Sequence, residues 1–225
     1  MTFGYIIGAA VLLLLLWLGD GIRRIGSVSV GKTIGERGGS ALLLIDLQSV
    51  FWDRGPYSDA ARQSASAVIL EEVAAARAQN HPVIAVRQEW SIPSTKVLAR
   101  LTMKGQAIEG SEGTELAGPF SSCPEHVIVK RVQDAFESGE LDALLERLNV
   151  SKLRLVGLDL NYCVQKTALA ARNRGYHVTV VKHGTLAAGP TEVAQKQLSS
   201  AGVVFACADI NPSRATGWNV RIADP

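Results

Sequence analysis

From residue 41 onward, the chain alternates short, wholly apolar runs with longer segments of helical periodicity. An apolar run of four to eight residues bounded by turn residues is typical of a strand that is buried on both faces. In residues 59–78 the apolar side chains Ile69, Val73 and Ala76 share one side, as in an amphipathic helix. The predicted strands are 41–45, 82–86, 127–129, 153–158, 177–181 and 203–206, and the predicted helices are 59–78, 141–148, 163–174 and 191–200.

Strands that alternate with helices in this way predict an α/β fold. We expect a doubly wound, mainly parallel six-stranded sheet flanked by helices. In such sheets the functional site forms at the carboxyl ends of the strands.

The first 18 residues follow a different pattern, because they contain no charged residue and 9–18 are almost purely aliphatic. As a helix, this segment would reach about 27 Å, enough to cross the hydrocarbon core of a membrane. A cleaved signal peptide and a buried core helix are the alternatives. No Lys or Arg precedes the apolar run and no A-x-A site follows it, which favours an uncleaved transmembrane anchor. The basic residues that follow predict an outside amino terminus and a cytoplasmic main domain: Arg23, Arg24, Lys32 and Arg37.

Residues 19–40 hold seven glycines and little periodicity, so they are predicted to form a flexible juxtamembrane linker. Residues 26–33 match the phosphate-loop pattern G-x-x-x-x-G-K-[ST], but neither a strand before it nor a helix after it is predicted, so nucleotide binding is not favoured. The expected organisation is an anchor (1–18), a linker (19–40), a main domain (41–215) and a carboxyl-terminal tail (216–225).

Charge and cysteine content narrow the classes of function. The chain has 23 Lys and Arg against 21 Asp and Glu, and residues 41–225 are neutral, so no basic field for nucleic acid is present. Three cysteines, Cys123, Cys163 and Cys207, are too few and too scattered for a disulfide scaffold or a zinc cluster. They suit a reducing compartment.

Three chemically distinct side chains lie at the functional ends of predicted strands: Asp46, Lys130 and Cys163. A thiol at a helix amino terminus near a lysine is expected to favour the thiolate, and a carboxylate can accept the thiol proton. Together they form an activated nucleophile with a proton shuttle. Taken singly, each has an ordinary structural interpretation, as a helix cap, a solvated lysine or a small buried thiol.

Several motifs occur in a fixed order along residues 41–207. They are a D-x-Q motif at Asp46 and Gln48, then 113–116, 129–130, 135–136 and 139–145, and above all 156–164, with the sequence VGLDLNYCV. With these motifs, residues 41–207 resemble the isochorismatase-like cysteine hydrolase superfamily, which includes nicotinamidases and N-carbamoylsarcosine amidohydrolases. Thr167, Ala168, Gly175 and Tyr176 follow in the order typical of the family.

The resemblance implies roles for these residues. Cys163 would be the nucleophile, Asp46 the general base and Lys130 its charged partner. It also implies a cis peptide between Leu158 and Asp159, with the backbone amides of Asp159 and Cys163 forming an oxyanion hole. Members that cleave a vinyl ether lack the cysteine, so amide-type C–N hydrolysis through a thioester is expected.

Nicotinamidases also carry a metal-binding Asp and several histidines after the first strand, whereas residues 51–56 here contain no histidine. The four histidines, His81, His126, His177 and His183, lack ligand spacing. We therefore predict no metal and no cofactor, which makes nicotinamide a less favoured substrate. Asp159 is unusual at its position, and its carboxylate would either disfavour anionic substrates or point to solvent.

The leading hypothesis is a metal-independent cysteine hydrolase acting on a small amide, ureido or N-carbamoyl compound, with possible homo-oligomerisation. A thiol redox sensor and a catalytically silent, membrane-tethered binding module are the alternatives. Cys123 and Cys207 are expected to be inert. Candidate residues of the substrate pocket are Gln48, Phe51, Trp52, Trp90, Phe136 and Tyr162.

Overall fold

The computed structural model describes residues 2–206. Cys207, the end of the predicted main domain and the predicted tail 216–225 lie outside the described residues. The helices are α1 (Thr2–Gly26), α2 (Ser49–Trp52), α3 (Asp59–Ala78), α4 (Pro93–Thr102), α5 (Glu140–Arg147), α6 (Gln165–Asn173) and α7 (Glu192–Ser200). The strands are β1 (Gly39–Ile45), β2 (Val83–Gln88), β3 (His126–Lys130), β4 (Val150–Gly157), β5 (His177–Thr185) and β6 (Val204–Ala206).

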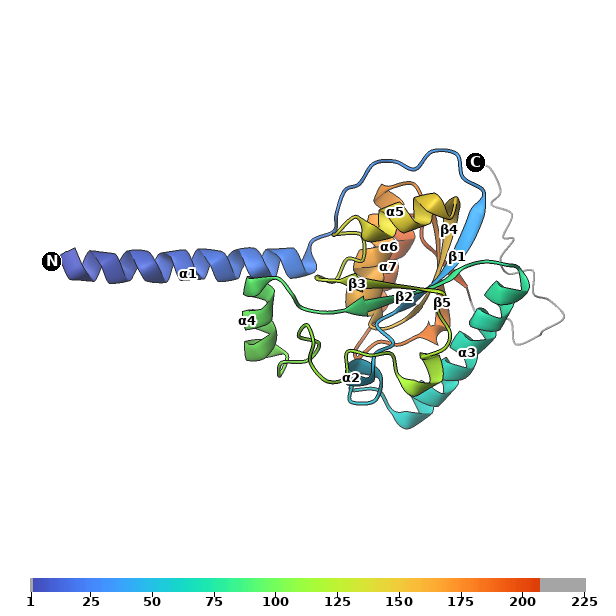
Figure 1. The fold of residues 1–225 in the computed structure, drawn as a ribbon, viewed down its shortest axis with the longest axis horizontal. Coiled ribbons are helices and arrows are strands. Elements are labelled where there is room, and N and C mark those ends of the chain that lie inside the picture. The colour runs from blue at the N-terminus through green and yellow to red at the C-terminus, as the bar shows by residue number, and fades with distance from the viewer. Residues whose placement is uncertain (1, 207–225) are drawn as a thin grey trace.

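The six strands form one parallel sheet in the order β3-β2-β1-β4-β5-β6 (Figure 1). The predicted six-stranded α/β architecture is thus confirmed. From β1 the sheet grows outward to β2 and β3, and the chain then returns to add β4, β5 and β6 on the other side. This reversal leaves a crevice beyond the carboxyl ends of β1 and β4, where ligands bind in folds of this kind.

Helices cover both faces of the sheet, with α5, α6 and α7 on one face and α3 on the other (Figure 1). Strand β1 shows why its run is apolar throughout. Leu43 and Ile45 pack in the cluster under α5 and α6, whereas Leu42 and Leu44 pack in the cluster under α3. Each fully buried side chain of this size stabilises the fold by about 1.5–3 kcal/mol. The helix predicted over 59–78 is the observed α3, which is capped by Ser58, whose hydroxyl accepts from the Ala61 amide at 3.2 Å.

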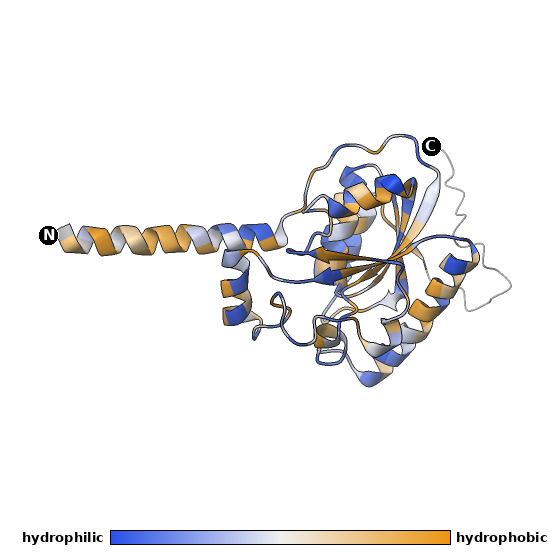
Figure 2. Cartoon of the chain, viewed as in Figure 1, coloured by the Kyte–Doolittle hydropathy of each residue, from blue (hydrophilic) through white to orange (hydrophobic). Residues whose placement is uncertain are grey.

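Helix α1 projects away from the domain and is predominantly hydrophobic along most of its length, with hydrophilic residues gathered in its last turns (Figures 1 and 2). Within it, Tyr5–Gly26 is long and apolar enough to cross a membrane, with a mean hydropathy of 2.1, and is mostly exposed. A signal sequence at the same place would have the same length and composition. The helix also continues past residue 18, so 19–26 are helical where the sequence predicted linker.

The last turns of α1 pack against the domain. Gly21 lies against Ser94 and Leu98 of α4, which leaves no room for a side chain at this position. Ile25 is buried in a cluster with Trp90 and Leu98. Its carbonyl accepts a hydrogen bond from the Gln133 amide at 3.2 Å.

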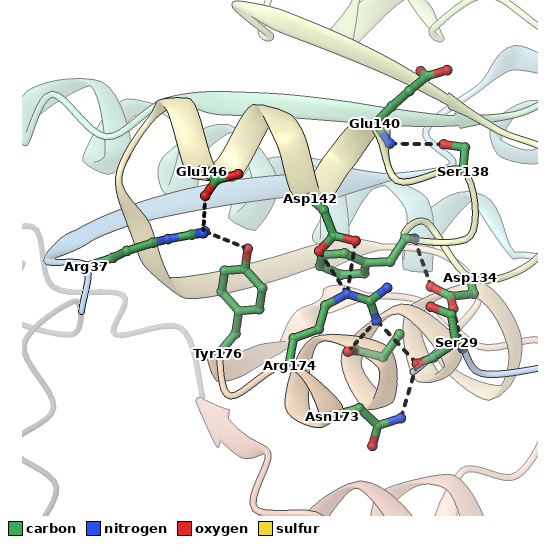
Figure 3. A network of polar contacts seen from close by, with 12 residues as sticks. Ser29, Arg37, Asp134, Ser138, Glu140, Asp142, Glu146, Asn173, Arg174 and Tyr176 are labelled. Atoms are coloured by element: carbon green, nitrogen blue, oxygen red, sulfur yellow. Dashed lines mark hydrogen bonds and ion pairs between the residues drawn. The ribbon is translucent and has the colours of Figure 1, made fainter. Parts of the chain in front are cut away.

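Backbone hydrogen bonds fix the path of the glycine-rich segment that follows, although its glycine content had suggested flexibility (Figure 3). The Ser29 amide donates to the Asp134 carboxylate at 2.7 Å, and the Ser29 carbonyl accepts from Asn173 and Arg174, each at 3.2 Å. The Arg37 guanidinium donates to the Tyr176 hydroxyl at 3.3 Å and forms an ion pair with Glu146, also at 3.3 Å. In the segment that resembles a phosphate loop (26–33), residue 26 ends α1 and 27–33 have no regular secondary structure; the next element is strand β1, not a helix.

Candidate active site

The structure brings the three predicted site residues together at the carboxyl edge of the sheet. The Lys130 ammonium lies 3.0 Å from Asp46 Oδ2 and donates to Cys163 Sγ at 3.2 Å. Lys130 and Asp46 are 1% and 2% exposed, whereas Cys163 is partly exposed. An acid, a cation and a thiol therefore form one contiguous group, and the thiol is the member that reaches the surface of the site.

Each residue owes its position to the end of a strand. Asp46 follows β1 directly and has a positive φ of 52°, a left-handed backbone conformation that is uncommon for non-glycine residues. Lys130 is the last residue of β3. Cys163 lies in a π-helical turn, Leu160–Val164, that links β4 to α6. The predicted helix start at residue 163 is therefore replaced by this turn, and α6 begins at Gln165.

Two glutamines hold Lys130 in place. Gln88, the last residue of β2, accepts a short hydrogen bond from the Lys130 ammonium through Oε1. Gln48 accepts from the Gln88 amide at 2.6 Å, and its own amide donates to the carbonyls of Gln88 and Thr114 at 3.0 and 2.8 Å. Gln48 is thus a buried bridge between β2 and the loop at Thr114, not the pocket residue that the sequence suggested.

Burial and charge together set the protonation of this group. Burial raises the pKa of Asp46, and the Lys130 ammonium and the Cys163 thiol offset part of that rise. Burial lowers the pKa of Lys130, but the charges of Asp46 and Cys163 raise it by more. Burial and the Asp46 carboxylate raise the pKa of Cys163 above its ordinary range, and Lys130 only partly opposes them. The raised pKa of Cys163 favours the neutral thiol, whereas the sequence analysis, which considered only the helix dipole and the lysine, expected the thiolate.

A buried acceptor is available for the thiol proton. Oδ1 of Asp46 is buried and has no hydrogen-bond partner among the described residues, while Oδ2 faces Lys130. An unpaired buried carboxylate oxygen destabilises the fold, so its presence here is consistent with a catalytic role as the acceptor of the thiol proton.

The turn before Cys163 is organised by Asp159. The peptide bond between Leu158 and Asp159 is cis. The Asp159 carboxylate accepts from the amides of Asn161 and Ala188 at 2.7 and 2.6 Å and from the Tyr57 hydroxyl at 3.1 Å. Burial and this carboxylate raise the pKa of Tyr57. The carboxylate is therefore anchored within the site and does not point to solvent.

A cavity of about 280 Å³ opens above the thiol. Of the six predicted pocket residues, Phe51, Trp90 and Tyr162 line it. Trp52 instead packs edge-on against Phe120 in the core under α3. Phe136 lies in the opposite core cluster beneath the Arg174 guanidinium, 4.6 Å from its ring centre. Of the five predicted aromatic residues, three thus line the cavity and two lie in the core.

Several lining residues escaped the sequence analysis. Gln88 is the last residue of β2. Residues at the carboxyl ends of strands were expected to form the site, but this strand was predicted to end at residue 86, so Gln88 was missed. Most others lie on loops whose path no local pattern predicts, and no signal in the sequence marks them. These lining residues are Pro56, Tyr57, Gln88, Met103, Gln106, Gln133 and Ala188.

Within residues 2–206, no group of three or more His, Cys, Asp or Glu side chains is placed to hold a metal ion. In the segment after β1, Asp53 is exposed and no histidine accompanies it. The described residues therefore do not fit the metal site that a nicotinamidase would need. Metal independence stays a prediction.

Comparison with known proteins gives one matching family and several similar folds. The family model of the isochorismatase domain matches residues 40–208. The structure of N-carbamoylsarcosine amidase from Thermoplasma acidophilum is similar, with a TM-score of 0.65 and 21% identity over 78% of this chain and 99% of that one. Pyrazinamidase/nicotinamidase from Streptococcus mutans UA159 has a TM-score of 0.65 and 22% identity, over 75% of this chain and 100% of the other. An isochorismatase family protein from Desulfovibrio vulgaris subsp. vulgaris str. Hildenborough has a TM-score of 0.66 and 26% identity, over 76% and 95% of the two chains.

Proposed function

The chain belongs to the isochorismatase family, and on this basis we propose that it is a cysteine hydrolase that cleaves a carbon–nitrogen bond of a small molecule. The observation that carries the proposal is the position of the Lys130 ammonium, which contacts both Asp46 and Cys163 at the base of a substrate-sized cavity. A nucleophile, a base and a group that orients the base are the parts that covalent catalysis requires.

The reaction proceeds in two halves. Cys163 Sγ attacks the carbonyl carbon while its proton passes to Asp46 Oδ1, the buried oxygen without a partner. The C–N bond breaks, the leaving amine or ammonia takes this proton, and an acyl thioester remains on Cys163. Water then attacks the thioester, giving the acid and restoring the thiol.

Two further features support this chemistry. Burial raises the pKa of Asp46, and the adjacent Lys130 ammonium opposes this rise and so favours the carboxylate form that accepts the thiol proton. The backbone amides of Asp159 and Cys163 form the oxyanion hole in this proposal, and each donor contributes about 3 kcal/mol to stabilising the tetrahedral intermediate. The steps call on no metal or cofactor.

The amino-terminal helix acts as an uncleaved single-pass anchor in this account, with the hydrolase domain in the cytoplasm. Arg23 and Arg24 follow the apolar segment, as the positive-inside tendency requires. A reporter fused after Pro225 that proved to be exported would contradict this orientation.

Of the alternatives, a thiol redox sensor has less support, because sensor cysteines have a lowered pKa whereas burial and Asp46 raise that of Cys163. A silent binding module would have no need of a buried, strained Asp46 beside a thiol. Nicotinamidase-like activity is a special case of the proposal and is tested with it.

The test is ammonia release by the purified protein. The full chain is used because residues 19–37 contact the domain and would be disturbed by a truncation, and detergent is added to keep the apolar amino-terminal helix in solution. Substrates are nicotinamide, a ureidoacrylate, an N-carbamoyl amino acid and simple carboxamides. Activity is expected to vanish in Cys163→Ala, to persist in the matched Cys123→Ala variant and to resist a chelator. Activity that survives Cys163→Ala would overturn the proposal, and chelator-sensitive activity would overturn its metal independence.

A further inference from the structure

The charged side chains that line the cavity above Cys163 are all acidic. They are Asp46 and Asp159, and no Lys, Arg or His belongs to the described residues that line the cavity. Asp46 is compensated by Lys130 at 3.0 Å. Asp159 contributes the remaining negative charge.

The partners of the Asp159 carboxylate are all neutral. Two backbone amides and the Tyr57 hydroxyl donate to it, so its hydrogen bonds are partly satisfied but its charge is not cancelled by any of them. The residue is only 9% exposed and lines the cavity together with Cys163. At an effective dielectric constant well below that of water, such a charge acts strongly on a ligand a few ångströms away.

Four aromatic side chains share this cavity with the carboxylate: Phe51, Tyr57, Trp90 and Tyr162. Aromatic faces attract organic cations and stack on flat rings. A carboxylate among aromatic rings is the combination that recognises an organic cation, and it repels a carboxylate-bearing compound.

We propose that the substrate of this site is an amide whose second functional group is an organic cation, such as an ammonium or a pyridinium, held by Asp159 and the surrounding aromatic rings. This rests on the proposed hydrolase function and narrows it. It places carboxylate-bearing N-carbamoyl and ureido compounds among poor substrates. It also gives Asp159 a role in specificity beyond its hydrogen bonds within the turn.

The neighbouring groove has a different character. It contains Arg54, which pairs with Glu112, and the exposed Lys104. Neither of these cations lines the cavity above the thiol. The charge preference at the thiol is therefore set by Asp159, whereas Lys104 acts only on groups that extend into the outer groove.

The first test needs no hydrolysis. Two methanethiosulfonate reagents, one ending in trimethylammonium and one in sulfonate, form a mixed disulfide with Cys163 and release methanesulfinate. Peptide mass spectrometry gives the rate at Cys163 for each reagent, and N-acetylcysteine amide supplies the reference ratio for a free neutral thiol. We expect the cation-to-anion rate ratio of the protein to exceed the reference at least about ten-fold.

Variants separate charge from structure. Asp159→Asn is expected to lower the ratio by about ten-fold, which corresponds to about 1.4 kcal/mol. Asp159→Glu keeps the charge and most of the preference. Asp53→Asn is the matched control, because Asp53 is exposed and lies outside the cavity lining. If Asp159→Asn fails to fold, the wild-type ratio still decides, since a ratio at or below the reference overturns the proposal.

The second test uses matched carboxamides with the full chain: 3-carbamoyl-1-methylpyridinium, nicotinamide and 3-carbamoylbenzoate. We expect kcat/KM to fall in this order, and the cationic preference to be lost in Asp159→Asn. Hydrolysis with the reverse order would overturn the charge preference while leaving the hydrolase function intact. A cation-selective thiol without hydrolysis of any amide would overturn the hydrolase function and, with it, the assignment of an amide substrate.

Discussion

Gly157, the last residue of β4, packs tightly against β1 at the point where the site begins. It lies opposite Ile45, the residue before Asp46, and has a φ of 121°, which side-chain-bearing residues rarely adopt. A Cβ at this position would lie 2.1 Å from the Ile45 carbonyl oxygen. Ordinary contact begins at 3.4 Å, so Gly157→Ala would force the two strands apart by about 1.3 Å.

Two effects are expected to lower the free energy of unfolding in Gly157→Ala. The strained backbone conformation costs about 1–3 kcal/mol, and the overpacking between strands adds about 1–3 kcal/mol. Gly157→Ala should therefore lower the free energy of unfolding by about 2–6 kcal/mol, a large share of the 5–15 kcal/mol typical of a domain. Since Asp46 follows the displaced residue, the 3.0 Å contact with Lys130 should also be lost, and amide hydrolysis with it.

The assay is urea unfolding of the full chain in mild detergent, combined with ammonia release below the transition. Gly118→Ala is the matched control, because a Cβ there meets nothing within 4 Å. We expect this control to lie within about 0.5 kcal/mol of the wild type. A Gly157→Ala protein with wild-type stability and activity would refute the link between this close approach and the position of Asp46.

Three further predictions concern the triad and the amino-terminal segment. Lys130→Met leaves the buried Asp46 carboxylate without its partner, so urea unfolding should show a loss of about 3–5 kcal/mol; an unchanged midpoint would mean that the ion pair contributes nothing. The rate of iodoacetamide labelling at Cys163 should keep rising with pH beyond the range of an ordinary thiol, since burial and Asp46 raise its pKa; a plateau at neutral pH would indicate a resting thiolate. Deletion of residues 1–38 should lower the thermal midpoint by several degrees relative to deletion of 1–18, because only the longer deletion removes Ile25 and Ser29 from the domain; equal midpoints in a calorimeter would contradict this.

The sheet could be predicted because its signals are local. Apolar runs identify buried strands whatever their neighbours are, and a parallel sheet collects residues from distant strand ends, such as Asp46, Lys130 and Cys163, at one edge. The sequence therefore predicted that these three residues lie at the same edge, and the structure brings Lys130 within 3.0 Å of Asp46 and 3.2 Å of Cys163.

The features that could not be predicted from the sequence depend on tertiary contacts. The pKa of Cys163 depends on its burial and on the Asp46 carboxylate beside it, and the helix dipole and the lysine, which the sequence does indicate, leave both out. Trp52 lies in the core because it packs against Phe120 under α3, and Phe136 because the Arg174 side chain covers its ring; no local periodicity reveals either contact. The segment around Ser29 has a defined path because its backbone forms hydrogen bonds with side chains far along the chain, those of Asp134 and Arg174.

The central claim is that Cys163 forms an acyl thioester during turnover, and mass spectrometry tests it most directly. The full chain is mixed with a hydrolysed carboxamide, quenched in acid within the first turnovers and measured intact, with Cys163→Ala and Cys123→Ala alongside. The account predicts a mass increase equal to the acyl group in the wild type and in Cys123→Ala, mapped to Cys163 and absent from Cys163→Ala. Rapid hydrolysis with no adduct on Cys163 at any quench time, or the same adduct in Cys163→Ala, would contradict it.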